Sequence, residues 1–567
     1  MGILKDRNGH VWRIPALFFA ICLAKILLFQ GTYWDFCTPD SAESASYFWA
    51  FYLIKISVPL LFGGIVLCFR RKGWSVGVLL FLDIWIIGNL VYYRSNGLCL
   101  DGYSSTLLGN LKGFEGGILA LLEWRDIIYP ALSLLYMAEV CREGKRKQRN
   151  ITAGIIAIVA AVALHFLAMG LFNRDVEKED RCLNPFSGGM YRIFPFINDY
   201  CSSVSVAHLF IYDISDVARI WLDRESSSSL ELTAEEREIL EKISHPELAS
   251  QRFQYRDTVV LVLVESLESW AVREDAMPNL YALAHSEHVL YADRVKTQIK
   301  AGTSADGQLI CNTGLLPIDR ATVCFAYPHN DFPSLTGAGA GKGVTILPHH
   351  DGVWNQKEMS PAYGYEGTLV RSEEDSAVFN AVLDCLKEGY TTIQTLTMSS
   401  HVPFNYGSSR SDLQTPAGMP ASMSNYLKCM NYTDSNLQIL LSELEEGGML
   451  HNATVIITGD HRIFCKEKRK RFAEFSTREG GNYDVFNDNT PLIIYSPHIE
   501  GNRYINSQCY QMDLYPTVMG LLGNPDPVWD GFGTNLLLNP SERRFTEKAA
   551  FSLSNKLIRS NFFASLY

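Results

Sequence analysis

Five long apolar segments in the first 172 residues constrain the fold more than any other feature of this sequence. Most of them approach the roughly 20 residues that a helix needs to cross about 30 Å of hydrocarbon. The first segment does not look like a cleaved signal, because no small-residue cleavage site follows it and further spans come after it. We therefore predict an N-terminal five-helix transmembrane bundle over residues 1–172. The segments are residues 11–29, 47–69, 74–93, 127–141 (the weakest, with an alternative start near residue 118) and 151–172.

Charges in the loops predict the orientation of this bundle. The N-terminal segment and the second and fourth loops carry Lys and Arg, whereas the first loop carries Asp35, Asp40 and Glu43 and no Lys or Arg. Because Lys and Arg favour the cytoplasmic side, we expect the N-terminus to lie inside the cell. An odd number of spans then places everything after residue 172 outside.

Three ionisable residues, Lys25, Lys55 and Asp83, lie within the predicted spans. Such residues are costly in a bilayer and are often functional. The structural alternative is that Lys55 pairs with Asp83, or that the lysine side chains extend to the interface; we favour this alternative. The loop of residues 94–126 is expected on the outer side, lying in the interface as amphipathic helices.

Net charge and cysteine spacing exclude several classes of protein. A net charge of −11 argues against a nucleic-acid partner, because phosphate binding needs a basic face. The 13 cysteines form no CxxC pair and no metal-ligand spacing, so we predict neither a zinc finger nor a dense disulfide framework. Cys311 with Cys324, or Cys182 with Cys201, are candidates for pairing by proximity in the sequence alone.

The remainder of the chain alternates strands and helices, which predicts an α/β fold with a mostly parallel central sheet sandwiched by helices. We expect a juxtamembrane connector over residues 173–252, a globular catalytic domain over residues 253–545 and a C-terminal tail over residues 546–567. The connector contains a helix at residues 232–242 with Thr233 as N-cap and Glu236 three residues later. The expected strands are residues 259–264, 344–347, 391–398, 454–458 and 492–495, and the expected helices are residues 278–285, 377–386, 426–446 and 512–522.

Reactive side chains follow three of these strands. Glu265 comes directly after the apolar run 259–264, at the strand end where open α/β sheets bind ligands. Gly459, Asp460 and His461 end another strand, and a carboxylate with an imidazole is a good pair for a divalent metal. His401 follows a third strand and is a candidate to hold phosphate or to protonate a leaving group. Taken singly, the glutamate reads as a solvated residue and the histidine as structural.

A small-residue turn adds a fourth element. Gly302 and Gly307 frame Thr303 and Ser304 at the start of a predicted helix over residues 305–311. One interpretation is that a hydroxyl group here is an N-cap and has no further role. Alternatively, Thr303 is a nucleophile, since a divalent cation lowers a hydroxyl pKa and the helix N–H groups stabilise charge on an incoming phosphate.

Together these motifs resemble the lipoteichoic acid synthase group of membrane phosphotransferases, in the sulfatase/alkaline phosphatase superfamily. The resemblance rests on Val-Glu265-Ser-Leu-Glu, Gly-Thr303-Ser, Ser-His401-Val-Pro-Phe and Ile-Thr-Gly-Asp460-His461. The segments 431–437 and 511–517 also look like family segments, so the similarity extends through most of the chain.

The resemblance implies a set of roles. Glu265, Thr303, Asp460 and His461 would bind one Mn²⁺ or Zn²⁺, and Thr303 would attack the phosphorus of a membrane phospholipid. The resemblance implies that the transferred phospho-alcohol is phosphoglycerol from phosphatidylglycerol and that it passes to a glycan or lipid-linked acceptor. The protein would lie in the cell membrane, or in the inner membrane of a cell with two, and its catalytic domain would face the periplasm or the cell exterior. The residues that would contact the phosphate or line the head-group pocket are His401, His349 or His350, and Trp354.

The sequence also departs from the family pattern. The family has an arginine two residues after the tryptophan, where this chain has Gln356. No histidine occurs in residues 462–474, which favours phosphoglycerol transfer over the alternative, phosphoethanolamine transfer. Thr303 in place of a Cys-x-Pro-x-Arg signature argues against a true sulfatase. A catalytically idle envelope-assembly protein is the alternative from another class.

Overall fold

A computed structural model describes most of the chain, and the chain divides into two compact units. One unit comprises residues 1–105 and 118–223, and the other comprises residues 106–117 and 224–567. Most of the predicted connector, with Cys182 and Cys201, and most of the loop 94–126 fall outside the described residues. These are 13–37, 45–69, 73–96, 119, 121–142, 150–174, 230–245, 257–300, 302–318, 321–338, 341–463, 466–479, 483–485, 488–523, 528–538 and 545–565.

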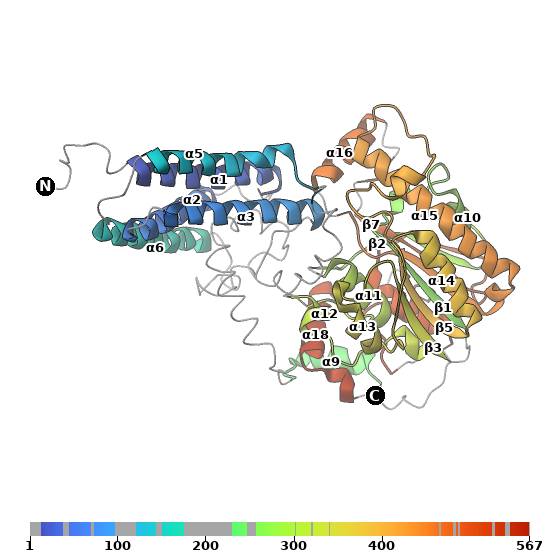
Figure 1. Ribbon diagram of the computed structural model, residues 1–567. Coiled ribbons are helices and arrows are strands. Elements are labelled where there is room, and N and C mark those ends of the chain that lie inside the picture. The colour runs from blue at the N-terminus through green and yellow to red at the C-terminus, as the bar shows by residue number, and fades with distance from the viewer. Residues whose placement is uncertain are drawn as a thin grey trace, which may run out of the picture. The chain divides into compact units, whose positions relative to one another are not determined.

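All five predicted membrane segments form helices in the first unit (Figure 1). Helices α2 and α6 pack with their backbones close together at Gly64 and Gly154. A Cβ atom added to Gly64 would lie 2.8 Å from the Gly154 carbonyl oxygen, so only glycine permits this approach. The helices are α1 (Arg13–Cys37), α2 (Ala45–Cys68), α3 (Gly73–Asn96), α5 (Ile128–Arg142) and α6 (Ile151–Arg174).

Within the described residues, two helical stretches are long and apolar enough to cross a membrane. They are Gly73–Tyr92 in α3 and Ile151–Ala168 in α6. A shorter apolar stretch, Lys55–Cys68, lies in α2, and α5 has only 15 residues. By length and composition, the described residues of this unit supply two candidate membrane spans rather than the five predicted.

The predicted ion pair between Lys55 and Asp83 is not the one that forms. Asp83 forms an ion pair with Lys25, not with Lys55. Ser133 of α5 donates a hydrogen bond to the second oxygen of Asp83, so one buried cluster joins α1, α3 and α5. Since Lys25 and Asp83 are separated by 58 residues, only the packing of the helices selects this partner.

The second unit is built on a nine-stranded sheet with the order β4-β3-β5-β1-β6-β7-β2-β8, and β9 pairs with β2. Pairing is parallel except along β7, which is antiparallel to both neighbours, so the α/β sheet is mixed. All five predicted strands are present. The strands are β1 (Thr258–Val264), β2 (Val289–Lys296), β3 (Lys342–Leu347), β4 (Thr368–Val370), β5 (Tyr390–Leu396), β6 (Ala453–Gly459), β7 (Asn489–Tyr495), β8 (Asn502–Ile505) and β9 (Cys509–Tyr510).

Helices cover both faces of the sheet (Figure 1). Helices α10, α14 and α15 gather on one side, and α11, α12 and α13 lie on the other. The four helices predicted for this region are present, with ends shifted by a few residues. The helices are α9 (Ala234–Ile243), α10 (Pro278–Ala284), α11 (Thr303–Thr313), α12 (Val323–Ala326), α13 (Gln356–Ala362), α14 (Asp375–Lys387), α15 (Ala421–Glu446), α16 (Lys466–Arg478), α17 (Leu514–Leu521) and α18 (Glu547–Arg559).

Two elements outside the alternating region pack against this core. Helix α9 begins with the predicted capping box, in which Thr233 and Glu236 bond each other's backbone N–H groups. Helix α18 lies in the segment predicted as a tail, and its Ser554 bonds both the N–H and the carbonyl of Leu316.

The candidate disulfide between Cys311 and Cys324 is not formed. Both thiols are free and buried. Proximity in the sequence alone therefore did not predict a bond here.

Candidate active site

The register of the parallel strands brings the predicted metal ligands together. Val264 at the end of β1 pairs with Gly459 at the end of β6, so Glu265 and Asp460 leave the sheet as neighbours. One ligand atom each from Glu265, Asp460 and His461 lies within 4.8 Å of the other two, and all three residues are buried. The apolar, β-branched sequences of β1 and β6 explain why these strands are central and why their ends are shielded from water.

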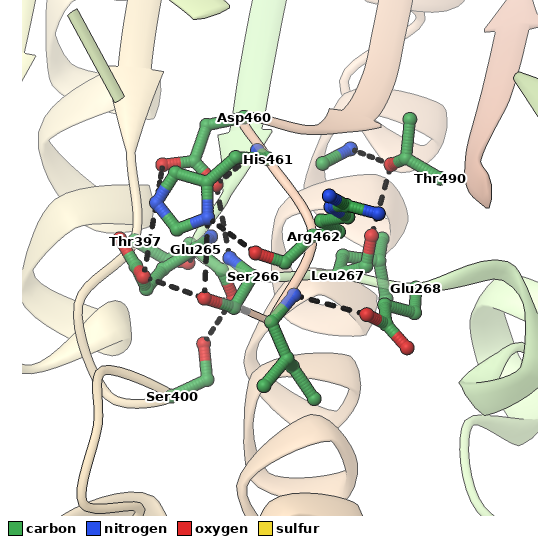
Figure 2. A network of polar contacts seen from close by, with 12 residues as sticks. Glu265, Ser266, Leu267, Glu268, Thr397, Ser400, Asp460, His461, Arg462 and Thr490 are labelled. Atoms are coloured by element: carbon green, nitrogen blue, oxygen red, sulfur yellow. Dashed lines mark hydrogen bonds and ion pairs between the residues drawn. The ribbon is translucent and has the colours of Figure 1, made fainter. Parts of the chain in front are cut away.

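Hydrogen bonds from neighbouring residues orient both carboxylates (Figure 2). Asp460 Oδ1 accepts the N–H groups of Ser266 at 2.9 Å and of His461 at 2.7 Å. Ser266 Oγ donates to Glu265 Oε1 at 2.8 Å. Ser266 has a φ of 54°, the left-handed region, which lets its N–H and its hydroxyl serve two different carboxylates.

The imidazole of His461 turns one nitrogen toward these carboxylates. Its Nδ1 lies 2.9 Å from the carbonyl oxygen of Arg462, which can only accept, so Nδ1 is the donor. Nε2 then lies 3.5 Å from Glu265 Oε1 and 3.4 Å from Asp460 Oδ2. Two hard oxygen donors and one imidazole nitrogen facing a common point are a set that fits Mn²⁺ or Zn²⁺.

The charges in this cluster also favour a bound divalent cation. Burial opposes ionisation of Glu265, but His461 and His401 outweigh it and lower the pKa of that carboxyl. Burial and the charge of Glu265 raise the pKa of Asp460 to about 7. Burial disfavours the charged imidazole of His461, yet Asp460 and Glu265 together raise its pKa. Two buried carboxylates thus share one imidazole, and a divalent cation would neutralise the excess negative charge.

The predicted nucleophile opens helix α11 next to this cluster. Thr303 is buried and has a φ of 41°, an uncommon conformation for a β-branched residue. The hydroxyl of the next residue, Ser304, lies close enough to the Asp460 carboxylate to lower its pKa. A Cβ atom added to Gly307 would lie 2.3 Å from the Asp460 carbonyl oxygen, so α11 contacts the metal-ligand strand backbone to backbone.

The predicted phosphate-binding histidines come from the two neighbouring strands. His401 follows β5 and lies close enough to Glu265 to lower its pKa. His349 follows β3, and burial lowers its pKa to about 4, so it is neutral at physiological pH. His401 and Glu265 both act on His349 electrostatically, which places it at the same edge of the sheet. The carboxyl ends of four adjacent strands, β3, β5, β1 and β6, therefore carry the candidate residues.

The other two predicted pocket residues have different contacts. His350 Nδ1 accepts the N–H of Gly352 at 3.2 Å and shapes a turn. The ring of Trp354 lies 6.5 Å from that of Phe325, and Asn355 donates to the carbonyl of Cys324, which ties this segment to α12. These contacts tie the two residues to their own loop and to α12, and they do not involve the carboxylates.

Sequence reasoning missed the residues that hold the ligands in place. The hydroxyl of Thr397 accepts the N–H of Glu265 at 3.1 Å, and Ser400 donates to the carbonyl of Glu265 at 2.8 Å. The buried Tyr426 donates to the carbonyl of Ser266 and accepts the N–H of Glu268. Their side-chain types are common in structural positions, and no local pattern distinguishes them.

Glu268 connects the two loops of the site. Its carboxylate accepts the N–H of Ile463 at 2.9 Å and pairs with Arg469 of α16. The loop after His461 is thus tied to the loop after β1 (Figure 2). The only sequence signal was its place in the motif that begins with Glu265.

Comparisons with known proteins agree with this architecture. The profile of the lipoteichoic acid synthase N-terminal domain matches residues 2–184, and the sulfatase profile matches residues 321–524. Lipoteichoic acid synthase 1 of Bacillus subtilis is 22% identical over 551 residues, covering 91% of this chain and 84% of the relative. Lipoteichoic acid synthase of Staphylococcus saprophyticus is 19% identical over 513 residues, covering 85% of this chain and 77% of the relative.

A solved structure shares the fold over nearly the whole length. The lipooligosaccharide phosphoethanolamine transferase A (EptA) of Neisseria meningitidis superposes with a TM-score of 0.53 and 12% identity, covering 91% of this chain and 96% of that one. At this identity the likeness concerns the fold alone. With both domain profiles matched in order, the chain is a lipoteichoic-acid-synthase-like protein of the sulfatase superfamily.

Proposed function

We propose that this protein is a metal-dependent phosphotransferase that moves phosphoglycerol from phosphatidylglycerol to a cell-envelope glycan or lipid-linked acceptor. The observation that carries the proposal is the meeting of Glu265, Asp460 and His461 within 4.8 Å beside the first turn of α11. The curated relatives that match along the chain are lipoteichoic acid synthases, which supports this class of reaction.

The divalent metal would be held by Glu265, Asp460 and His461, with the Thr303 hydroxyl as a fourth ligand. When bound, the cation would supply positive charge that favours the alkoxide form of a coordinated hydroxyl and stabilises charge on the phosphoryl oxygens. The choice between Mn²⁺ and Zn²⁺ is open in this donor set, because both accept carboxylate and imidazole ligands.

The reaction consists of two displacements at phosphorus. In the first, Thr303 Oγ forms a bond to phosphorus and loses its proton, while the bond to the diacylglycerol oxygen breaks and that oxygen takes a proton. In the second, the acceptor hydroxyl oxygen bonds to phosphorus and loses its proton, while the bond to Thr303 Oγ breaks and that oxygen takes a proton, which restores the free threonine. Neutral His349, with His401, would donate hydrogen bonds to the phosphoryl oxygens, and His350 and Trp354 would contact the head group.

The orientation in the membrane that we propose is based on the distribution of Lys and Arg in the loops. Five spans over residues 1–172 would anchor the protein in the membrane with its N-terminus inside. A connector over residues 173–252 would lead to a catalytic domain over residues 253–545 in the periplasm or at the cell exterior. This placement gives the site access to a lipid head group and to envelope acceptors.

Mass spectrometry of Thr303 after incubation with defined lipids tests the proposal. Full-length protein is mixed with vesicles of phosphatidylglycerol or of phosphatidylethanolamine, and the adduct on the α11 peptide is weighed. We expect a phosphoglycerol ester on wild-type protein and on Thr303→Ser, and none on Thr303→Ala.

The alternative outcomes contradict the proposal in different ways. An ethanolamine-phosphate adduct identifies the other head group, and turnover by Thr303→Ala excludes Thr303 as the nucleophile. Protein that carries no Mn or Zn and hydrolyses no phospholipid analogue would be an idle assembly factor.

A further inference from the structure

The turn that presents Thr303 has an unusual conformation, and something must hold it. At a φ of 41°, Thr303 lies in the left-handed region, where a β-branched residue is strained. A strained residue keeps such a geometry only when its surroundings determine it. Contacts from the surrounding residues must therefore hold the backbone of Thr303 in this conformation.

Asp306, three residues into α11, reaches back over this turn. Its Oδ2 accepts the backbone N–H of Lys300 at 2.8 Å and the backbone N–H of Gly302 at 2.9 Å. These two bonds hold the chain just before Thr303. The carboxylate is 2% exposed, so water does not compete for its oxygens.

The fit between Asp306 and the turn is close enough to dictate a glycine. A Cβ atom added to Gly302 would lie 2.1 Å from Asp306 Oδ1, well inside van der Waals contact. Any side chain at residue 302 would push the carboxylate off its two N–H partners. On its other face, the first turn of α11 contacts Asp460 through Ser304 and Gly307.

We propose that Asp306 is a positioning residue, which locks the left-handed turn so that the Thr303 hydroxyl faces the metal-ligand cluster. The proposal deepens the proposed function and rests on it for its activity readout. Asp306 itself makes no contact with the reacting atoms; it acts through the backbone of Lys300 and Gly302. Burial raises the pKa of Asp306 to about 6, although the two N–H bonds lower it. At neutral pH the group is therefore mostly ionised, and a carboxylate accepts hydrogen bonds more strongly than a carboxylic acid does.

A double-mutant cycle on full-length protein in phosphatidylglycerol vesicles tests the lock. The variants are Asp306→Ala, Asp306→Asn, Gly302→Ala and the double variant Gly302→Ala/Asp306→Ala. We expect Asp306→Ala and Gly302→Ala each to slow single-turnover formation of the Thr303 ester about 100-fold, with KM and bound metal nearly unchanged. Asp306→Asn should stay within about threefold of wild type, because one amide oxygen can accept both N–H groups.

The double variant separates a lock from two unrelated defects. Without the carboxylate, the added methyl group meets no obstacle, so the double variant should be no slower than either single variant. Losses that multiply would overturn the proposal, as would an Asp306→Ala rate within threefold of wild type. An Asp306→Asn rate as low as that of Asp306→Ala would show that charge, not the hydrogen-bonded turn, matters.

Hydrogen exchange of the Lys300 and Gly302 amides provides a readout that needs no catalysis. Both amides should be protected in wild type and in Asp306→Asn, and should exchange quickly in Asp306→Ala; equal protection in all three contradicts the lock. If wild type forms no Thr303 ester, the proposed function fails while the exchange result still decides the role of Asp306. Should Asp306→Ala not fold, the Gly302→Ala and Asp306→Asn pair still decides it.

Discussion

At the scale of single residues, the site is defined by two buried carboxylates, Glu265 and Asp460, and a single imidazole does not balance the charge of both. His461 lies 3.5 Å from Glu265 and 3.4 Å from Asp460, and it is shared by both. The pKa values of the two carboxyls move apart, down for Glu265 and up to about 7 for Asp460. A cation at their common point would let both ionise, which is the physical reason to expect a metal here.

Metal content should therefore depend on these two carboxylates. We expect Glu265→Gln and Asp460→Asn each to lower metal affinity by more than the roughly 10–100-fold that loss of an outer partner produces, since each removes a ligand. Bound Mn and Zn are measured by elemental analysis of purified protein after dialysis against graded chelator.

Asp257 offers a matched control for this measurement. It is also a buried carboxylate beside a histidine, with His498 Nε2 at 2.8 Å, but it precedes β1 and lies at the opposite end of the strand. Asp257→Asn should leave the metal content unchanged. Full metal occupancy in Glu265→Gln or Asp460→Asn would disprove the ligand assignment.

At the scale of elements, α9 and α18 brace one another through a single carboxylate. Glu236 of α9 accepts from Lys556 Nζ at 2.6 Å and from Ser552 Oγ at 2.8 Å, both on α18, and also caps its own helix. Helix α18 in turn contacts the segment before Thr303, because Lys300 Nζ lies 4.0 Å from the centre of the Phe551 ring. Helix α9 is thus linked to the segment that precedes Thr303 by packed elements.

This contact predicts a pH-dependent stability. Burial alone would raise the pKa of Glu236, but Lys556, Thr233 and Ser552 lower it to about 2, from 4.5. A depressed acid stabilises the fold above its unfolded pKa and loses that contribution as the pH falls from about 4.5 toward 2. Glu236→Gln should therefore cost on the order of 2 kcal/mol at pH 7 and roughly half of that at pH 3.

Calorimetry of the full-length protein in detergent at both pH values measures this effect. Glu238→Gln is the control, since Glu238 pairs with Lys242 on the exposed face of the same helix. It should leave the unfolding transition where it is. A Glu236→Gln effect that is equal at pH 7 and pH 3 contradicts the assignment to the ionised carboxylate.

At the scale of the whole molecule, one property of the sheet assembles the candidate site. Strands β3, β5, β1 and β6 are adjacent and parallel, so the residues that follow them emerge at one edge. His349, His401, Glu265 and Asp460 are spread over more than 190 positions of the sequence, yet each directly follows one of these strands or lies within a few residues of it. An enzyme on a membrane lipid also needs this edge on the correct side of the bilayer.

The proposed topology makes that side testable. With the N-terminus inside and an odd number of spans, protease added to right-side-out membrane vesicles should degrade residues 224–567. The same protease added to inverted vesicles should leave them intact, as followed by antibodies against the C-terminal unit. Degradation in inverted vesicles alone would reverse the orientation and exclude an envelope acceptor.

The sequence by itself determined the strands and helices whose signals are local. Six apolar residues before Glu265, the Gly-Asp-His end of β6 and the capping box at Thr233 each depend on neighbours in the chain, and the structure has each element in place. The resemblance of the motifs also indicated which side chains to compare. Strand β2 was missed because only its first half is apolar, and β4, β8 and β9 are too short to give a pattern.

Only the tertiary structure decided which distant groups meet. The antiparallel place of β7 between β6 and β2, the pairing of Asp83 with Lys25, and the hold of Thr397, Ser400 and Tyr426 on the Glu265 turn all join residues far apart in the chain. Such contacts are chosen by packing and strand register, which no local pattern encodes. For the same reason, the sequence could name Thr303 as a candidate nucleophile, while the way in which Asp306 and Asp460 enclose its turn emerged from the fold.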